Sequence, residues 1–151
     1  MLQLTGYFPW LEEKERSELK VSHMEIFRFD SEPIENCNPL GSALCICGLL
    51  KVFSCGVAGY AEYTIPDTRT NIDLVQWASV FIRLKGLSIA ESIRYVQDKD
   101  EVWGPERKIL VECALTDLIS NLNNPMQQLE RVSHSRERSL LFDRSQAYFA
   151  F

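Results

Sequence analysis

The cysteines are the residues of this chain with the clearest capacity for metal or redox chemistry. Five are present: Cys37, Cys45, Cys47, Cys55 and Cys113. Cys45 and Cys47 form a C-x-C pair in a strand-like stretch, so their side chains should share one face. A zinc site needs four ligands, and only Cys55, His23 and His134 could complete one. Of the two interpretations, a metal or redox pair and two small buried apolar side chains, we favour the second.

Other catalytic groups are not arranged in a recognisable pattern. Cys55 or Ser54 could be combined with either histidine, but a chain of this size permits such a set by chance and has no G-x-S-x-G nucleophile elbow. Glu112 and Asp117 are five positions apart on a predicted helix, so they point in different directions and form no acid/base pair. The glycines make no standard phosphate-binding loop. We therefore do not expect this chain to be an enzyme on its own.

The composition excludes several classes of partner. The chain has 151 residues and a formal net charge of −5, whereas nucleic-acid binding depends on Lys and Arg. No apolar run approaches the roughly 20 residues that a membrane span needs. The first residues lack the pattern of a signal peptide, and an odd number of cysteines favours free thiols in a reducing compartment. We expect no nucleic-acid partner, no membrane association and a cytoplasmic location.

Strand patterns dominate residues 19–65. Residues 21–29 alternate between two faces, of which one is more apolar, and residues 43–53 form an almost continuous apolar run. The turn Ser54-Cys55-Gly56 then leads into a third apolar run over residues 57–65, which is a hairpin signal. These segments predict a three-stranded antiparallel meander.

Helix patterns dominate residues 68–130. We expect a first helix over residues 71–85, capped by its first residue, Asn, and ended by Gly86. A capping box of the form S-x-x-E opens a second helix over residues 88–97. A third helix begins with proline and spans residues 105–123, with leucines on one stripe.

Strands followed by helices is the order of an α+β fold. We expect a three-stranded meander followed by a three- to four-helix bundle. The domain would span residues 19–130, with an N-terminal extension at 1–18 and a C-terminal tail at 131–151.

Three segments follow one another in a distinctive order: KVSHMEIFRF (20–29), GVAGYAEYTIP (56–66) and ECALTDLISNLNNPMQQL (112–129). In this order they resemble the N-terminal capping domain of the enolase superfamily, in its mandelate racemase and muconate lactonizing branch. The branch typically has a strand reading G-x-x-G-x-G-E, followed later by a helix reading A-x-x-x-A-x-x-D-L and a Pro-Leu turn. The resemblance covers roughly residues 20–130 and implies an enolase N-terminal domain-like fold.

Individual positions carry this resemblance. Gly56, Gly59 and Glu62 match the strand pattern, with Ala61 where the family prefers glycine. The residues in the helix pattern are Cys113, Ala114, Asp117, Leu118 and Pro125.

The family's chemistry resides in a second domain, a (β/α)8 barrel. There, carboxylates hold Mg²⁺ and Lys or His bases move a proton. This chain has no K-x-K sequence and no carboxylates spaced in the manner of barrel strands. The resemblance therefore implies no cofactor here, and Mg²⁺ only if the chain pairs with a separate barrel.

Two capping-domain loops help to select substrate in complete enzymes, and they correspond to residues 31–42 and about 64–71 here. The polar groups presented would be Glu35, Asn36, Asp67, Thr68 and Arg69. Without a barrel opposite them, we favour the interpretation of these loops as ordinary connections.

Two functional hypotheses follow. The first is a non-catalytic, stand-alone capping-like domain that acts through self-association or a protein partner. Its candidate interface residues are aromatic side chains near both ends: Phe8, Trp10, Phe142, Tyr148, Phe149 and Phe151. At least one terminus should pack on the domain or on a second copy, and deletion of residues 139–151 should lower solubility or alter the oligomeric state.

The second hypothesis is a subunit of a split isomerase or lyase that closes over a separately encoded barrel. It requires Mg²⁺-dependent activity only when both chains are present. A milder variant is a small-molecule pocket near Trp77 and Trp103, although both tryptophans lie in apolar helical contexts typical of a core.

Overall fold

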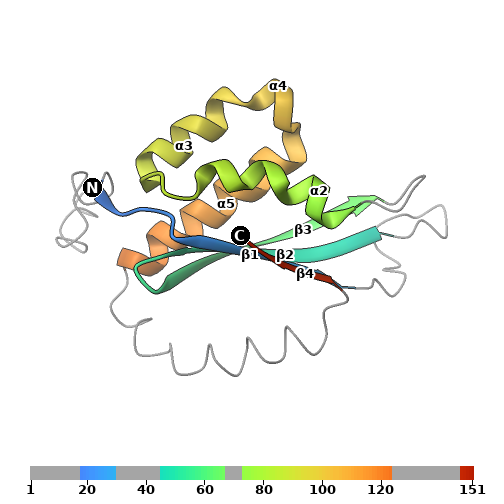
Figure 1. The fold of residues 1–151 in the computed structure, drawn as a ribbon, viewed down its shortest axis with the longest axis horizontal. Helices are drawn as coiled ribbons and strands as arrows, with labels where there is room; N and C mark the ends of the chain where they lie inside the picture. Colours follow the sequence, from blue (N-terminus) through green and yellow to red (C-terminus); the bar gives the residue numbers. More distant parts are fainter. Residues whose placement is uncertain (1–17, 30–44, 67–72, 124–146) are drawn as a thin grey trace, which may run out of the picture.

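The computed structural model describes residues 18–29, 45–66, 73–123 and 147–151. These residues form a mixed α+β structure, with helices packed on one face of a four-stranded antiparallel sheet (Figure 1). The strands are β1 (His23–Phe29), β2 (Cys45–Ser54), β3 (Val57–Pro66) and β4 (Ala147–Ala150). The helices are α2 (Leu74–Ala78), the 3-10 helix η2 (Ser79–Leu84), α3 (Ile89–Asp98), α4 (Asp100–Trp103) and α5 (Pro105–Asn123).

The expected three-stranded meander was incomplete, because a fourth strand pairs with its first strand. The sheet order is β3-β2-β1-β4, and β4 comes from the segment expected to be a tail. The backbone N–H of Met24 donates to Phe151 O at 2.8 Å, and the N–H of Phe151 donates back to Met24 O at 3.0 Å. Phe151 is buried in the core and Phe149 packs against it. The expectation that one terminus packs on the domain is thus confirmed for residues 147–151.

The predicted hairpin between β2 and β3 is confirmed. Ser54 pairs with Val57, which leaves a turn of only Cys55 and Gly56. Both have positive φ values, 52° and 74°, as a type I′ turn requires. This turn matches the twist of the two strands and fixes their register over ten residue pairs.

The expected first helix was wrong in its cap and in its regularity. Asp73, rather than Asn71, caps α2, with its side chain accepting from the N–H groups of Val75 and Gln76; Asn71 lies outside the described residues. The helix then continues as the 3-10 segment η2. At this junction the Ser79 hydroxyl donates to Gln76 O at 2.7 Å, a local contact that competes with regular helical bonding.

The other helix signals are confirmed. Gly86, with φ of 88°, follows η2. Ser88 and Glu91 form the capping box of α3, with the Ser88 N–H donating to Glu91 Oε2 at 2.9 Å and the Glu91 N–H donating to Ser88 Oγ at 3.1 Å. Pro105 is the first residue of α5. The hydrogen bond from the Ser88 backbone lowers the pKa of the exposed Glu91 carboxyl.

A chain of aromatic rings joins the sheet to the helices. Tyr63 contacts Trp77, Trp77 contacts Phe81, and Phe81 contacts Trp103, with ring centroids 5.4, 5.8 and 5.4 Å apart. Tyr95 completes the chain against Trp103 at 5.9 Å. Trp103 is therefore buried in the core, and the half-buried Trp77 packs against it. Within the parts of the chain that the structure describes, no helix is long and apolar enough to cross a membrane.

Candidate functional site

The face of the sheet opposite the described helices carries polar and charged side chains, and we call it the outer face. Neighbouring positions on β1 and β2, such as Met24 and Leu50, point into the helical core, so the alternating positions lie on the other side. The residues that define the outer face are Glu25, Phe27, Phe29, Cys47, Leu49, Lys51, Phe53, Tyr60, Glu62, Thr64 and Tyr148.

A buried ion pair lies at the centre of the outer face. Lys51 Nζ is 3.7 Å from Glu25 Oε2, and both side chains are at most 4% exposed. The ammonium group also lies 5.0 Å and 5.2 Å from the ring centroids of Phe53 and Tyr60. The Tyr148 hydroxyl adds a hydrogen bond to Glu25 Oε1 at 3.1 Å. Removal of one partner would leave the other charge buried, so a single substitution of Lys51 or Glu25 should be strongly destabilising.

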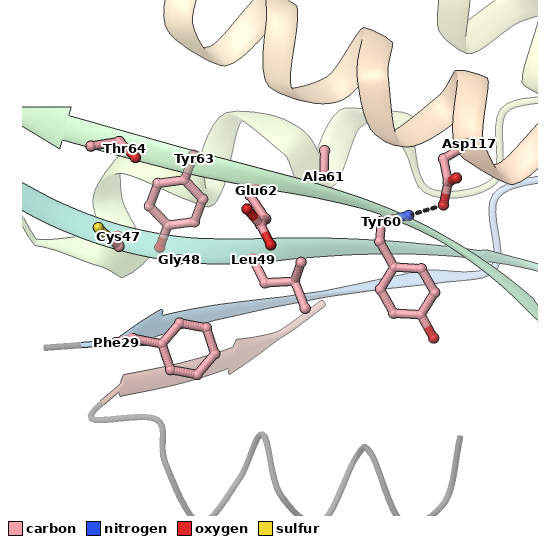
Figure 2. Close-up of a pocket in the computed structure, with 10 residues that line it drawn as sticks. All are labelled: Phe29, Cys47, Gly48, Leu49, Tyr60, Ala61, Glu62, Tyr63, Thr64 and Asp117. Carbon is pink, nitrogen blue, oxygen red and sulfur yellow. Dashed lines mark hydrogen bonds between the residues drawn. The ribbon is translucent and has the colours of Figure 1, made fainter. Parts of the chain in front are cut away.

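A cavity of about 660 Å³ opens beside this cluster, along β2 and β3 (Figure 2). Figure 2 shows the side chains of Tyr60 and Glu62 on the outer face, with Asp117 of α5 next to the backbone of Tyr60. The lining residues are Phe29, Cys47, Gly48, Leu49, Tyr60, Ala61, Glu62, Tyr63, Thr64 and Asp117.

Helix α5 covers one half of the free edge of β3. The Tyr60 N–H donates to Asp117 Oδ2 at 2.8 Å. The Asn121 side-chain amide donates to Ala58 O at 2.8 Å and to Asp117 Oδ2 at 3.1 Å. Side chains of a helix thus occupy the positions that another strand would otherwise fill.

Gly59 allows this close approach of α5 to β3. A Cβ atom at this position would collide with Ala114 O and with the backbone nitrogen of Leu118. The strand glycine and the helical aspartate of the sequence pattern are therefore parts of one contact. Their role in this structure is to hold α5 against the sheet edge.

Beyond Tyr60, the edge of β3 is open as far as the described residues are concerned. Glu62 and Thr64 alternate in phase with Ala58 and Tyr60, so their backbone N–H and C=O groups point to the same edge. No strand among the described residues pairs with them. Both side chains are exposed, and Pro66, which has no N–H, ends the strand. The open part of the edge therefore offers main-chain donors and acceptors beside the cavity.

The side chain of Tyr63 lies on the face of β3 that packs against the helices. Its hydroxyl reaches across β2 and donates to Phe27 O at 2.8 Å, which is possible because Gly48 leaves the space for the ring. Burial raises the pKa of Tyr63 above its ordinary value, so the phenol stays protonated and remains a donor. This bond ties β3 to β1 across the intervening strand.

Among the described candidate zinc ligands, the structure does not bring Cys47 and Cys55 together. Cys47 lies in the cavity, whereas Cys55 is exposed in the turn, eight residues along the chain and roughly 25 Å away by strand geometry. His23 stacks on Phe53, with centroids 4.0 Å apart, and its Nδ1 is 3.2 Å from the Ser22 hydroxyl. Across residues 18–29, 45–66, 73–123 and 147–151, no group of three His, Cys, Asp or Glu side chains could hold a metal ion.

Glu112 and Asp117 have different partners and point in different directions. Glu112 pairs with Lys108 at 4.0 Å along the helix surface, while Asp117 binds β3. The two carboxyl groups thus have different partners, as expected from their directions on the helix.

Several candidate residues lie outside the described residues: Glu35, Asn36, Asp67, Thr68, Arg69, Phe8, Trp10, Phe142 and His134. The proposed start of the second loop was wrong, because Thr64 and Pro66 belong to β3. Of the aromatic interface candidates, Tyr148 lies on the outer face and is 36% exposed, whereas Phe151 is only 9% exposed and belongs to the core.

Sequence reasoning missed the buried Lys51–Glu25 pair and the edge contact of Asn121. A lysine inside the apolar run GLLKVFS was a usable signal, because an unpaired charge is rarely buried in a sheet. Asp117 and Asn121 are also four residues apart on α5, which places them on one helix face.

Comparisons of this chain with protein-family models, curated proteins and solved structures find no match. The chemistry of the candidate site therefore rests on its own geometry. That geometry offers hydrogen-bonding groups of an extended main chain, an aromatic ring at Tyr60, and the carboxylates of Glu62 and Asp117.

Proposed function

We propose that this chain is a non-catalytic, capping-like domain that works by association with another protein chain. The observation that supports this most directly is the open half of the β3 edge beside the cavity of about 660 Å³. Free N–H and C=O groups on an edge strand are a template for a further strand. At the opposite edge of the sheet, β4 already pairs with β1.

The roles of the pattern residues support the capping-like part of this proposal. Gly56 has positive φ in the hairpin turn, Gly59 lets α5 approach β3, and Asp117 caps the strand edge. Each role stabilises a strand–helix unit and needs no barrel. The same residues could therefore serve in a domain that has no reaction of its own.

Substitutions at Thr64 test the proposal. Thr64→Pro removes an edge N–H while leaving the β2–β3 hydrogen bonds in place, because proline is tolerated where the N–H faces away from the sheet. Thr64→Val keeps the N–H and a β-branched shape, so it is the matched control. Circular dichroism and thermal unfolding establish that both variants are folded.

The measurement is the mass of the native full-length protein, purified gently from its own cells and analysed by light scattering and peptide identification. We expect a species heavier than the 17.4 kDa of one chain, which Thr64→Pro reduces to a monomer and Thr64→Val preserves. A monomer for the unaltered protein, or an assembly that Thr64→Pro leaves intact, contradicts the proposal. A second chain of barrel size with Mg²⁺-dependent activity only in the complex would replace it with the split-enzyme alternative.

A further inference from the structure

We infer that the segment added to the open β3 edge is an extended stretch of a partner protein that carries a lysine or arginine. This inference rests on the proposed function and specifies the partner. The residue that indicates this partner is Glu62, which lies in the open half of the edge and lines the cavity. Its side chain is exposed, and within the described parts of the chain it forms no ion pair.

The register places Glu62 where it would meet a partner side chain. Glu62 faces Leu49 of β2, so its carboxylate lies over an apolar neighbour on the outer face (Figure 2). A partner residue opposite Glu62 would have its Cβ about 5 Å away on the same face. A lysine or arginine there could reach the carboxylate while its methylene groups cover Leu49.

A second acidic group lies at the closed end of the same edge. Asp117 lines the cavity and uses Oδ2 to hold Tyr60 N–H and Asn121. Its charge remains, so the incoming segment meets carboxylates at both Asp117 and Glu62.

The same features disfavour a second copy of this chain as the occupant. Symmetric pairing through β3 would bring two acidic edges together, and each chain already carries a formal net charge of −5. Like charges on opposed strands are destabilising. Pro66 at the end of β3 also removes a donor that a symmetric ladder would use. An acidic edge with a free main chain is instead complementary to a basic strand.

The test uses the full-length protein, labelled with ¹⁵N, and two capped peptides of about seven residues, which span the open edge when extended. Both alternate threonine and valine, and they differ only in having lysine or glutamate at the centre. Titrations are followed by amide chemical-shift changes in β3. The variants are Glu62→Lys, Glu62→Gln and the pair Thr64→Pro and Thr64→Val.

We expect the lysine peptide to shift the Glu62 and Thr64 amides and to bind about tenfold more tightly than the glutamate peptide, because attraction is replaced by repulsion. Glu62→Gln should reduce binding of the lysine peptide by about fivefold. Glu62→Lys should reverse the preference. Thr64→Pro should abolish binding of both peptides, and Thr64→Val should not.

The outcomes separate this inference from the proposed function. Equal binding of the two peptides, with continued sensitivity to Thr64→Pro, overturns the charge preference and leaves strand addition intact. Binding that Thr64→Pro does not affect, or no shift at Glu62 and Thr64, overturns both. A native assembly that contains only copies of this chain and depends on Thr64 overturns the basic partner while supporting association.

Discussion

Replacement of Gly59 by alanine is the most direct test of how α5 is held on the sheet. A Cβ atom added at this position would lie 2.5 Å from Leu118 Cβ and closer still to Ala114 O and the Leu118 backbone nitrogen. Carbon atoms in contact are ordinarily about 3.5–4.0 Å apart. Two of the colliding atoms are backbone, so no rotamer change relieves the clash. The helix must therefore move away from β3 by roughly 1 Å.

This movement of the helix lowers the free energy of unfolding through two effects. Overpacking of a well-packed core typically destabilises by about 1–3 kcal/mol. A shift of α5 also stretches the hydrogen bonds of Asp117 and Asn121 to β3, both 2.8 Å long, and a bond to a charged group contributes about 1.5–3 kcal/mol. The gain from replacing a strand glycine offsets only about 0.5–1 kcal/mol. We expect Gly59→Ala to lower the free energy of unfolding by about 3 kcal/mol.

Equilibrium unfolding in urea, followed by tryptophan fluorescence, measures this change. Gly86→Ala is the matched control, because a Cβ there has nothing within 4 Å and meets only the strain of a φ of 88°. That strain costs about 1–2 kcal/mol. Comparison of the free energies of unfolding of Gly59→Ala and Gly86→Ala therefore separates the steric effect from the loss of a glycine.

A double-mutant cycle strengthens the test. Asp117→Ala alone should cost about 1.5–3 kcal/mol, because it leaves the Tyr60 N–H without its partner. In the Gly59→Ala background, the displaced helix has already weakened that bond, so the second substitution should cost less. If Gly59→Ala is no less stable than Gly86→Ala, or if the two effects simply add, the contact between α5 and β3 does not work as the structure indicates.

Three further predictions concern other parts of the fold. Tyr63→Phe should lower the free energy of unfolding by about 1 kcal/mol through loss of the bond to Phe27 O; urea unfolding unchanged within experimental error would refute this. The lowered pKa of Glu91 gives stability that is present above its unfolded pKa and lost as pH falls through the folded one. Glu91→Gln should therefore flatten the acid limb of the stability–pH profile, and an unaltered limb would exclude the capping box as its source. Deletion of residues 147–151 should cost about 3 kcal/mol, since it removes the buried Phe151 and uncovers β1, and light scattering should show increased self-association; a stable, monomeric product would contradict it.

Local patterns in the sequence predicted much of the secondary structure. Alternating side chains indicated β1, the Cys-Gly turn indicated the hairpin of β2 and β3, and the S-x-x-E sequence indicated the start of α3. Each of these depends on residues that are close in the chain, so the physical cause is visible in a short window. The same kind of evidence identified Gly59 and Asp117 as a pattern without revealing that they belong to one contact.

The candidate site itself was decided by tertiary structure. Asp117 meets Tyr60 across 57 positions, and Tyr148 meets Glu25 across 123. Such pairings depend on sheet order and helix docking, which leave no local periodic signal. β4 has only four residues, which are too few for a reliable strand pattern. It forms because the edge of β1 provides backbone groups with which it can pair. The sequence alone therefore determined most of the strands and helices but not β4, whereas only their assembly left half of the β3 edge unpaired by any described strand, beside a cavity.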